Sequence, residues 1–354
     1  MISQEEIKKI LDISVNAPSG SNSQPWRFEV KENIINIIAL PEKDHPILNF
    51  NFRGTWVAHG ALIENIIITS SSLGYKADFK IFPDKSNSNI TAQIKLEKDI
   101  SIKKDELFDF IPKRSTNRNK FKDINLTSDQ ESEFLDSIPE ISNGRIVFIS
   151  DRDLMKSVGG ALSMNEVVMF ENENLHKLFF NEIVWNKEEE KKRGGGLYIE
   201  TMGLKFPGNI FIKLFKNWKW MSIANKLGIA KKIAQDNAKN YSSGSVLGSI
   251  IVKDEDQEFI TAGRLLERIW LKAEKFGMGL QLITGILFLS RAIKTGSGSL
   301  FSKDQIDLIN TSHDRISAIF KPNNDETIAL VFRIGYGGTP KAYSAKKQAE
   351  IKFI

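Results

Sequence analysis

Apolar residues recur at helical spacing in two segments of the chain that resemble each other. The first segment, HGALIENIIITSSSLGYKADF, begins at His59, and the second, AGRLLERIWLKAEKFGMGLQL, begins at Ala262. At one constant offset the matching pairs are Gly60 and Gly263, Leu62 and Leu265, Glu64 and Glu267, Ile66 and Ile269, and Gly74 and Gly277. The spacing predicts an amphipathic helix in each copy, which ends at a glycine because a left-handed C-cap favours that residue.

Alternation of apolar and polar positions predicts strands around these helices. The expected strands are Phe28 to Val30, Ala77 to Phe82, Ile90 to Leu96, Gly279 to Ile283 and Thr327 to Ile334. Two of them follow the two helix copies directly, and two others form a second matching pair. We therefore expect two related α+β halves, with a chance likeness between two amphipathic helices as the alternative.

The two halves are unequal in length. The first is expected to span residues 1–110 and the second residues 111–354, with an extra segment at about residues 175–244. Within it, Lys205 to Lys232 holds seven lysines and no acidic residue, and Phe211, Leu214, Phe215 and Trp218 fall on one helical face. This pattern predicts a basic amphipathic helix. We expect the segment to fold over a cleft as a lid, and a helix on a membrane surface is the alternative.

Composition excludes several classes of protein. The 354 residues are 41% hydrophobic and 26% charged, which is typical of a folded globular chain. A net charge of +5 is too weak a bias to indicate a nucleic-acid surface. There are no cysteines, so disulfides, thiolate metal sites and thiol catalysis are excluded. The four histidines, His45, His59, His176 and His313, lack ligand spacing and give no support for a metal site.

The start of the chain also constrains where the protein works. Ser3 and Glu6 have the spacing of a capping box that opens a helix, and no basic end followed by an apolar run precedes it. No uncharged apolar stretch approaches the ~20 residues of a spanning helix. We therefore expect a cytoplasmic protein without stable membrane insertion.

A loop rich in small polar residues follows the first predicted helix. Ala17 to Phe28 has the sequence APSGSNSQPWRF, with many hydrogen-bonding side chains that could surround one polar, planar ligand. The alternative is a plain connector, because its prolines and glycine form turns and Trp26 could anchor it in the core.

This run resembles the loop of FMN-dependent nitroreductase-like flavoproteins, in which Pro, Ser and Asn line the flavin ring. The resemblance implies that Pro18, Ser19 and Asn22 bind FMN. The family's Arg-x-Ser-x-Arg pattern is missing before the loop, but Arg114, Thr116 and Arg118 in KRSTNRNKF match it at the head of the second half. The whole arrangement resembles tandem, single-chain members of the family, the Acg type.

The resemblance implies how a site would be assembled. Family homodimers build each FMN site from the loop of one subunit and the Arg pattern of the other, so this chain is expected to form one site between its own halves, as an intrachain pseudo-dimer that can be a monomer. Further expected contacts are Ile283, Thr284 and Gly285 with the flavin N5 atom, and Lys346 and Lys347 with the phosphate. A solvated tail is the alternative for the two lysines.

The sequence thus predicts an α+β nitroreductase-like fold with one FMN and a helical lid. The expected function is oxidoreduction, in which the flavin passes hydride or electrons to an unidentified small acceptor, with NAD(P)H as a possible donor. Glycine-rich runs do not match a dinucleotide-binding fingerprint. No side chain is singled out as a general acid or base. The alternatives are a non-catalytic FMN-sequestering or storage protein with a closed lid, and a peripheral membrane protein that acts through Lys205 to Lys232.

Overall fold

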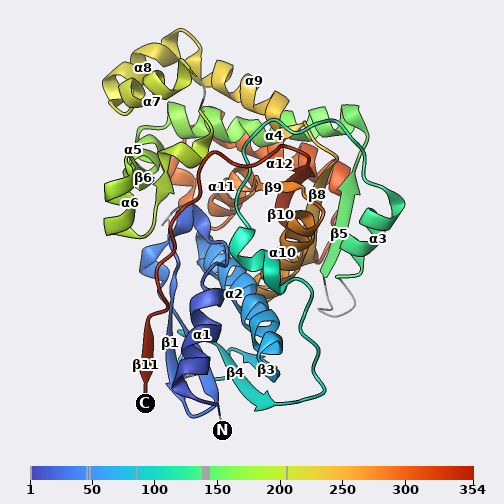
Figure 1. Cartoon of the computed structure of the whole chain (residues 1–354). Helices are drawn as coiled ribbons and strands as arrows, with labels where there is room; N and C mark the ends of the chain where they lie inside the picture. The colour runs from blue at the N-terminus through green and yellow to red at the C-terminus, as the bar shows by residue number, and fades with distance from the viewer. Residues whose placement is uncertain (1, 45–46, 48, 85, 138–143, 205) are drawn as a thin grey trace.

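The described residues form two main β-sheets with helices packed between and around them (Figure 1). The computed structural model describes residues 2–44, 47, 49–84, 86–137, 144–204 and 206–354. The first sheet has the order β11-β1-β2-β4-β3 and the second the order β5-β8-β10-β9. Apart from the parallel pair of β1 and β11, neighbouring strands in both sheets are antiparallel. The fold is therefore α+β.

The strands are β1 (Trp26–Lys31), β2 (Ile34–Ala39), β3 (Tyr75–Ile81), β4 (Ile90–Lys98), β5 (Gly144–Ile149), β6 (Ile183–Val184), β7 (Leu197–Tyr198), β8 (Val246–Lys253), β9 (Gly279–Leu282), β10 (Glu326–Gly335) and β11 (Ile351–Phe353). The α-helices are α1 (Gln4–Ser14), α2 (Arg53–Ser72), α3 (Ser128–Leu135), α4 (Arg152–Glu171), α5 (Glu173–Glu182), α6 (Lys187–Arg193), α7 (Gly208–Phe215), α8 (Trp218–Lys226), α9 (Ile229–Tyr241), α10 (Glu258–Lys275), α11 (Gly285–Lys294) and α12 (Lys303–Phe320).

The predicted capping box, helices, glycine caps and strands are confirmed, but of the two helix copies only α10 is amphipathic, because α2 is buried on nearly every side. The Ser3 hydroxyl accepts a hydrogen bond from the Glu6 N–H, and the Glu6 carboxylate accepts one from the Ser3 N–H. Gly74 and Gly277 end α2 and α10 with φ values of +72° and +68°. Each predicted strand is present, with ends that differ by up to two residues.

Helices α2 and α10 cross at the centre of the molecule. Helix α2 is apolar on nearly every side, and most of its residues are buried, which is the pattern of a helix inside a core. Leu62, Ile63 and Ile66 of α2 share one hydrophobic cluster with Leu266 and Ile269 of α10. Side chains from both sheets complete that cluster, so the two sheets are joined through this helix pair.

The C-terminal segment returns to the first sheet, which the sequence did not predict. After β10 the chain crosses the molecule and β11 pairs in parallel with β1, with Phe28 opposite Ile351 and Val30 opposite Phe353. Figure 1 shows this segment (dark red) running down beside β1, so that both termini lie at the same end. The expected second half, residues 111–354, therefore contributes a strand to the sheet of the first.

The single basic helix expected between Lys205 and Lys232 is wrong. Lys205 lies outside the described residues, and the rest of the segment forms α7, α8 and the start of α9. The chain turns at Asn217, whose side chain accepts a hydrogen bond from the Lys219 N–H, and again at Gly228, which has a φ of +78°. Asn capping and a left-handed glycine both end helices, so the predicted face is divided between two helices.

Candidate functional site

The loop after α1 is held in a specific, partly strained conformation. Ser21, Asn22 and Gln24 have φ values of 45°, 56° and 51°, a region that non-glycine residues rarely adopt. The Ser19 hydroxyl accepts a 2.9 Å hydrogen bond from the Gln24 N–H. The loop is further fixed where the Pro25 carbonyl oxygen lies 2.9 Å from His59 Nε2. Such strain is retained where a structure holds polar groups in place for a ligand.

His59 acts here as a packing residue. Its side chain is fully buried in α2, and burial lowers its pKa to about 4, so the imidazole is neutral near pH 7. Its ring packs edge-on against Trp26 at the start of β1.

The segment with the Arg-x-Thr-x-Arg pattern is anchored on the edge of β9. Thr116 forms a β-bridge with Leu280, and the Asn117 N–H donates a 3.0 Å hydrogen bond to the Leu280 carbonyl oxygen. The Arg118 carbonyl oxygen accepts a hydrogen bond from Asn240 Nδ2 at 3.1 Å. These contacts fix the backbone from which Arg114 and Arg118 extend.

One cavity of about 160 Å³ brings the two segments together. Of the residues predicted to bind the cofactor, those that line it are Pro18, Ser19, Asn22, Arg114, Thr116, Arg118 and Lys346. Its other walls include residues that the sequence did not indicate, among them Asn16, Leu197, Thr201 and Tyr343. Asn22 Nδ2 donates a 2.8 Å hydrogen bond to the Ala345 carbonyl oxygen, which ties the loop to the returning C-terminal segment.

Arg114 is the central cation of this cavity. Its side chain is 5% exposed, its guanidinium lies 4.5 Å from the centre of the Trp270 ring, and it donates a 2.7 Å hydrogen bond to the Asn16 carbonyl oxygen. Arg114 Nε is 3.6 Å from Glu267 Oε1. Burial raises the pKa of Glu267 to about 7, although Arg114 opposes this rise. The carboxylate therefore neutralises Arg114 only in part, and the cavity keeps positive charge.

Lys346 and Lys347 differ in placement although they are adjacent. Lys346 Nζ donates a 2.8 Å hydrogen bond to the Ala17 carbonyl oxygen and lines the cavity. Burial, followed by repulsion from Arg114, lowers the pKa of Lys346 well below its ordinary value. Lys347 is exposed, and its side chain lies against Gly194 outside the cavity lining. The structure therefore brings Lys346 to the predicted site and leaves Lys347 away from it.

A larger cavity of about 860 Å³ adjoins the first, and both are lined by Ser21, Arg118 and Leu197. Its walls come mainly from α4, α7 and α9, and they also include Ile283, Thr284 and Gly285. The Ile283 N–H donates a 2.8 Å hydrogen bond to the Val331 carbonyl oxygen, so it is already satisfied within the protein, and contact of the three residues with a flavin stays a prediction. Among the described residues, the N–H groups of Thr284 and Gly285, at the start of α11, have no such acceptor.

Glu166 of α4 is a buried acid in the larger cavity that the sequence analysis missed. Its Oε1 accepts hydrogen bonds from the Tyr241 hydroxyl at 2.5 Å and from Asn237 Nδ2 at 3.0 Å. Its Oε2 is buried and has no partner among the described residues. Burial raises the pKa of Glu166 to about 7, so this carboxyl can carry a proton near neutral pH. The sequence does contain a signal for this site: Glu166 is an acidic residue directly before the apolar run VVMF, residues 167–170.

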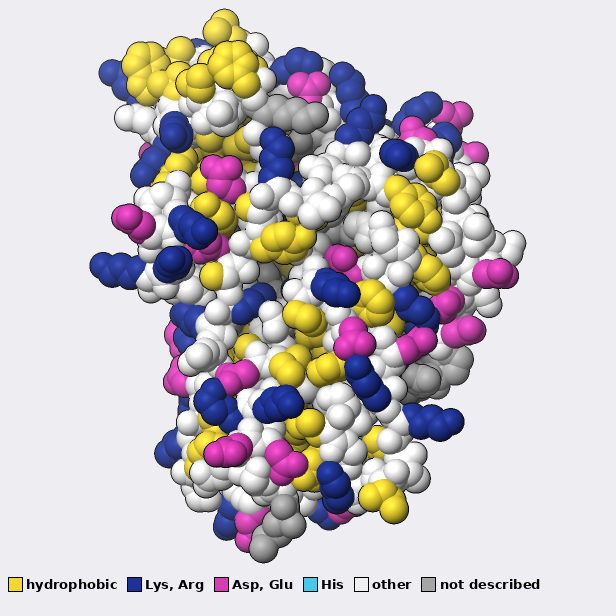
Figure 2. Space-filling view, in the orientation of Figure 1, with side chains coloured by type: hydrophobic (Ala, Val, Ile, Leu, Met, Phe, Trp, Pro, Cys, Tyr) yellow, Lys and Arg dark blue, Asp and Glu magenta, His cyan; other side chains and the backbone are white. Residues whose placement is uncertain are grey.

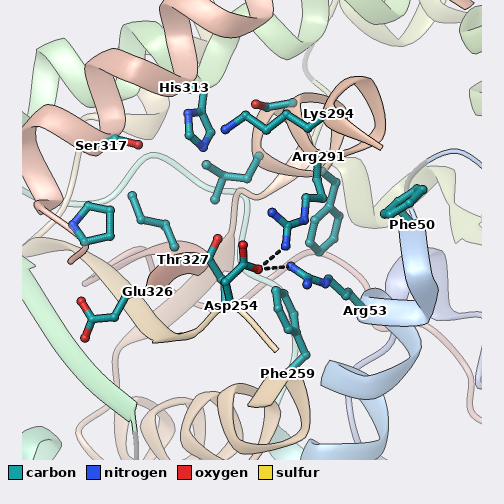
Figure 3. A pocket seen from close by; sticks show the side chains of 16 residues that line it. Phe50, Arg53, Asp254, Phe259, Arg291, Lys294, His313, Ser317, Glu326 and Thr327 are labelled. Atoms are coloured by element: carbon teal, nitrogen blue, oxygen red, sulfur yellow. Dashed lines mark hydrogen bonds and ion pairs between the residues drawn. The ribbon is translucent and has the colours of Figure 1, made fainter. Parts of the chain in front are cut away.

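A third, smaller cavity lies elsewhere, between the start of α2, α11, α12 and β10 (Figure 3). Its volume is about 120 Å³, and Arg53 and Arg291 both pair with Asp254 inside it. His313 lines it, and none of the predicted cofactor residues does. These ion pairs join Arg53 of α2 and Arg291 of α11 to Asp254, which directly follows β8 of the second sheet.

Among the residues that the structure describes, no group of three His, Asp or Glu side chains is arranged to hold a metal ion. His45 lies outside these residues, and His176 is buried with its Nε2 2.8 Å from the Phe215 carbonyl oxygen. In the same part of the chain, no helix combines the length and apolarity needed to cross a membrane.

Comparisons with known proteins give distant relatives. No protein-family model matches the chain. It is 19% identical over 349 residues to an uncharacterised protein of Mycobacterium tuberculosis, a match that covers 96% of this chain and 47% of that protein. It is 26% identical over 118 residues to a second M. tuberculosis protein, named provisionally as an NAD(P)H nitroreductase, with 33% of this chain and 34% of that protein covered. The chain thus spans half or less of these relatives.

Solved structures give low-scoring similarities. A nitroreductase with bound FMN from Desulfitobacterium hafniense is 11% identical, with a TM-score of 0.40, and the match covers 71% of this chain and 98% of that one. An iodotyrosine deiodinase bound to FMN and 3-iodo-L-tyrosine is 11% identical, with a TM-score of 0.37, and 70% and 97% of the two chains are covered. At these scores, function has to be inferred from this chain's own residues.

Proposed function

We propose that the protein binds one FMN per chain and is an oxidoreductase of the nitroreductase-like type, with the two halves of the chain acting as an intrachain pseudo-dimer. One observation carries this proposal: the loop of Pro18, Ser19 and Asn22 and the segment of Arg114 and Arg118, far apart in sequence, line the same cavity. The relative named as an NAD(P)H nitroreductase supports a nicotinamide as the electron donor.

The polar atoms of the cavity fit a flavin phosphate and ring. Asn22 Oδ1, Arg114 Nε and Ser115 Oγ are buried and have no hydrogen-bond partner among the described residues, although all three residues line the cavity. Leaving such atoms unpaired costs about 1–3 kcal/mol each, so a polar ligand would stabilise them. Arg114 and Lys346 would hold the phosphate. The bound dianion would favour the protonated form of Lys346, whose pKa is otherwise lowered by burial and Arg114, and charge-assisted bonds from two cations would then stabilise it.

The remaining residues would prepare the site for electron transfer. Bound FMN would supply hydride or electron transfer at its ring. Pro18, Ser19 and Asn22 would hold that ring, and the N–H groups of Thr284 and Gly285 are available to a polar edge of it. Glu166 would deliver a proton to the acceptor, because its carboxyl is neutral below about pH 7 and its Oε2 is unpartnered in the adjoining cavity.

The space beside the cofactor site supports an enzyme over a storage protein. The adjoining cavity of about 860 Å³ falls in the range of small-molecule sites, and a second molecule would enter it beside the cofactor. A storage protein with a closed lid has no use for that space or for a buried acid in it. Because the chain itself contains both parts of the site, a monomer would suffice.

Lys346→Met tests the cofactor site, and Lys347→Met is its matched control. The first substitution removes a cation that lines the cavity, and the second removes an exposed neighbour. We expect the purified parent to contain about one FMN per chain. In Lys346→Met, affinity for added FMN should fall by ~1.5–3 kcal/mol, the contribution of a charge-assisted bond, while Lys347→Met stays close to the parent.

Fluorescence titration of the flavin-free protein measures these affinities. Two flavins per chain, or equal losses in the two variants, would contradict the proposed site. Anaerobic mixing with NADPH and then with nitroaromatics or quinones tests turnover separately. A bound flavin that dithionite reduces, but that passes electrons to none of these acceptors, would favour storage.

A further inference from the structure

Large apolar side chains gather on the outer surface of α7 and α8. This surface, here called the α7–α8 patch, consists of the exposed side chains of Phe206, Ile210, Leu214, Trp220, Ile223 and Leu227. Leu227 is 81% exposed and Phe206 80%. Figure 2 shows hydrophobic side chains clustered over α7 and α8, with Lys and Arg side chains beside them. Patches of this kind on a soluble protein mark interaction sites.

The patch is separate from the face by which α7 and α8 pack against the rest of the protein. Ile212 of α7 and Met221 of α8 are buried in a hydrophobic cluster of their own, together with Phe170 and Phe180. Helices α7 and α8 therefore carry a second apolar face that points away from the protein. Folding of the chain does not account for that face.

The charged side chains of the segment that carries the patch are all basic, although Lys232 pairs with Asp236 further along α9. Between residues 206 and 232 there are six lysines and no aspartate or glutamate. The lysines are Lys213, Lys216, Lys219, Lys226, Lys231 and Lys232. An apolar face with lysines around it is the pattern of segments that lie in the interface of an anionic lipid bilayer, where each basic side chain near the surface adds about 1 kcal/mol. Exposed Trp220 fits this setting, since tryptophan favours the membrane–water interface.

We propose that the α7–α8 patch docks the protein on the surface of a membrane that contains anionic lipids. A second copy of this chain fits the patch less well, because a two-fold contact would place two groups of six lysines against each other. Phe211 of α7, an exposed side chain outside the six that define the patch, also lines the 860 Å³ cavity. The docked lipid surface would therefore adjoin that cavity, and apolar molecules dissolved in the bilayer would have a short path to it.

The test is co-sedimentation of the purified full chain with vesicles. The probes are vesicles of equal parts phosphatidylcholine and phosphatidylglycerol, and vesicles of phosphatidylcholine alone. We expect binding to the mixed vesicles, weaker binding in high salt because ions screen the lysines, and little binding to the neutral vesicles. The double variant Ile210→Ser/Leu227→Ser should bind the mixed vesicles at least about tenfold more weakly, since two exposed apolar anchors are lost.

Two matched controls separate docking from general effects. Ile100→Ser changes an apolar side chain that is 96% exposed outside the patch, and it should leave vesicle binding unchanged. Lys213→Glu/Lys219→Glu should weaken binding to the anionic vesicles, while Lys80→Glu, an exposed lysine of β3, should not. Circular dichroism and thermal unfolding verify that each variant is folded.

Several outcomes would overturn the proposal. These are no binding to the mixed vesicles at low salt, or an equal loss of binding in Ile100→Ser and in the double variant. Sedimentation velocity provides a further check: a concentration-dependent dimer that Ile210→Ser/Leu227→Ser abolishes would assign the patch to a second copy of the chain. None of these measurements depends on bound FMN, so failure here is distinguishable from failure of the proposed function.

Discussion

Gly60 of α2 and Gly263 of α10 lie where the two helices cross. Each glycine faces the backbone of the opposite helix, one turn before the glycine of that helix. A Cβ atom on Gly60 would lie 2.0 Å from the Ile260 carbonyl oxygen, and one on Gly263 would lie 2.0 Å from the Val57 carbonyl oxygen. These two contacts are equivalent under the offset that relates the two sequence segments. The crossing thus has the local two-fold symmetry of a homodimer interface, which supports an intrachain pseudo-dimer.

Gly60→Ala should destabilise the protein by about 1–3 kcal/mol, because the added methyl group would force apart two closely packed helix backbones. Gly263→Ala should have a similar effect, and the double variant should lose less than the sum, since one separation of the helices accommodates both methyl groups. Denaturant unfolding followed by circular dichroism measures these differences. A Gly60→Ala protein as stable as the parent would show that the helices are not in this contact.

Gly160→Ala is the matched control for that prediction. Gly160 also lies within a helix, α4, but a Cβ atom there would meet nothing within 4 Å. The substitution should leave stability unchanged or raise it by up to about 1 kcal/mol, because alanine favours helix more than glycine does.

Local periodicity predicted much of this fold. The two central helices, their left-handed glycine caps and the principal strands follow from spacing and turn chemistry, which act over a few residues. The pairing of β11 with β1 could not be predicted in this way. Ile351–Phe353 is too short to show alternation, and its partner Phe28 is more than three hundred residues away. The division into residues 1–110 and 111–354, with an insertion at 175–244, stays a prediction.

The candidate site shows a similar limit. The loop and the Arg pattern could be recognised as motifs, but motif spacing does not decide where adjacent side chains point. Lys346 and Lys347 lie in a segment without regular secondary structure, and of the two only Lys346 lines the cavity. Motif spacing also does not show which N–H groups are free. The Ile283 N–H, just after β9, donates to the Val331 carbonyl oxygen, whereas the N–H groups of Thr284 and Gly285 have no backbone acceptor among the described residues. Glu166 becomes a candidate proton donor only in the folded structure, where Asn237 and Tyr241 of α9 donate hydrogen bonds to it.

Arg114→Ala should weaken FMN binding and also destabilise the flavin-free protein, by two separable routes. The first is the loss of a cation that lines the cavity, worth ~1.5–3 kcal/mol of affinity. The second is the loss of the charge that opposes the raised pKa of Glu267, which then rises above about 7. Loss of stability should therefore be small near pH 6, where Glu267 is neutral, and larger near pH 8, where its buried charge is unpaired.

The double variant Arg114→Ala/Glu267→Gln separates these routes. Removing the carboxylate should restore most of the stability near pH 8 without restoring affinity for FMN. Thermal unfolding of the flavin-free proteins and fluorescence titration with FMN give the two readouts. Recovery of FMN binding in the double variant would mean that Arg114 acts by neutralising Glu267, without contacting the cofactor.

Glu166→Gln should change how stability depends on pH. Burial raises the folded-state pKa of Glu166 from 4.5 to about 7. Between those two values the folded protein binds more protons than the unfolded chain, so the contribution of Glu166 is fully present below about pH 4.5 and is lost as the pH rises through about 7. Linkage puts this loss on the order of 3–4 kcal/mol. The glutamine variant keeps hydrogen-bonding groups for Tyr241 and Asn237 but cannot ionise, so its stability should fall less across this range.

The measurement is the free energy of unfolding of parent and variant between about pH 5 and pH 8, and the quantity compared is their difference at each pH. That comparison cancels the contributions of other carboxyls whose pKa is raised, such as Glu267 and Glu274, because both proteins contain them. Glu171→Gln, at the exposed end of the same helix, is the control and should parallel the parent. If Glu166→Gln also parallels the parent, the carboxyl is not held protonated near neutral pH. Its proposed role as proton donor to the acceptor then fails with it, because a carboxylate with an ordinary pKa carries no proton at neutral pH.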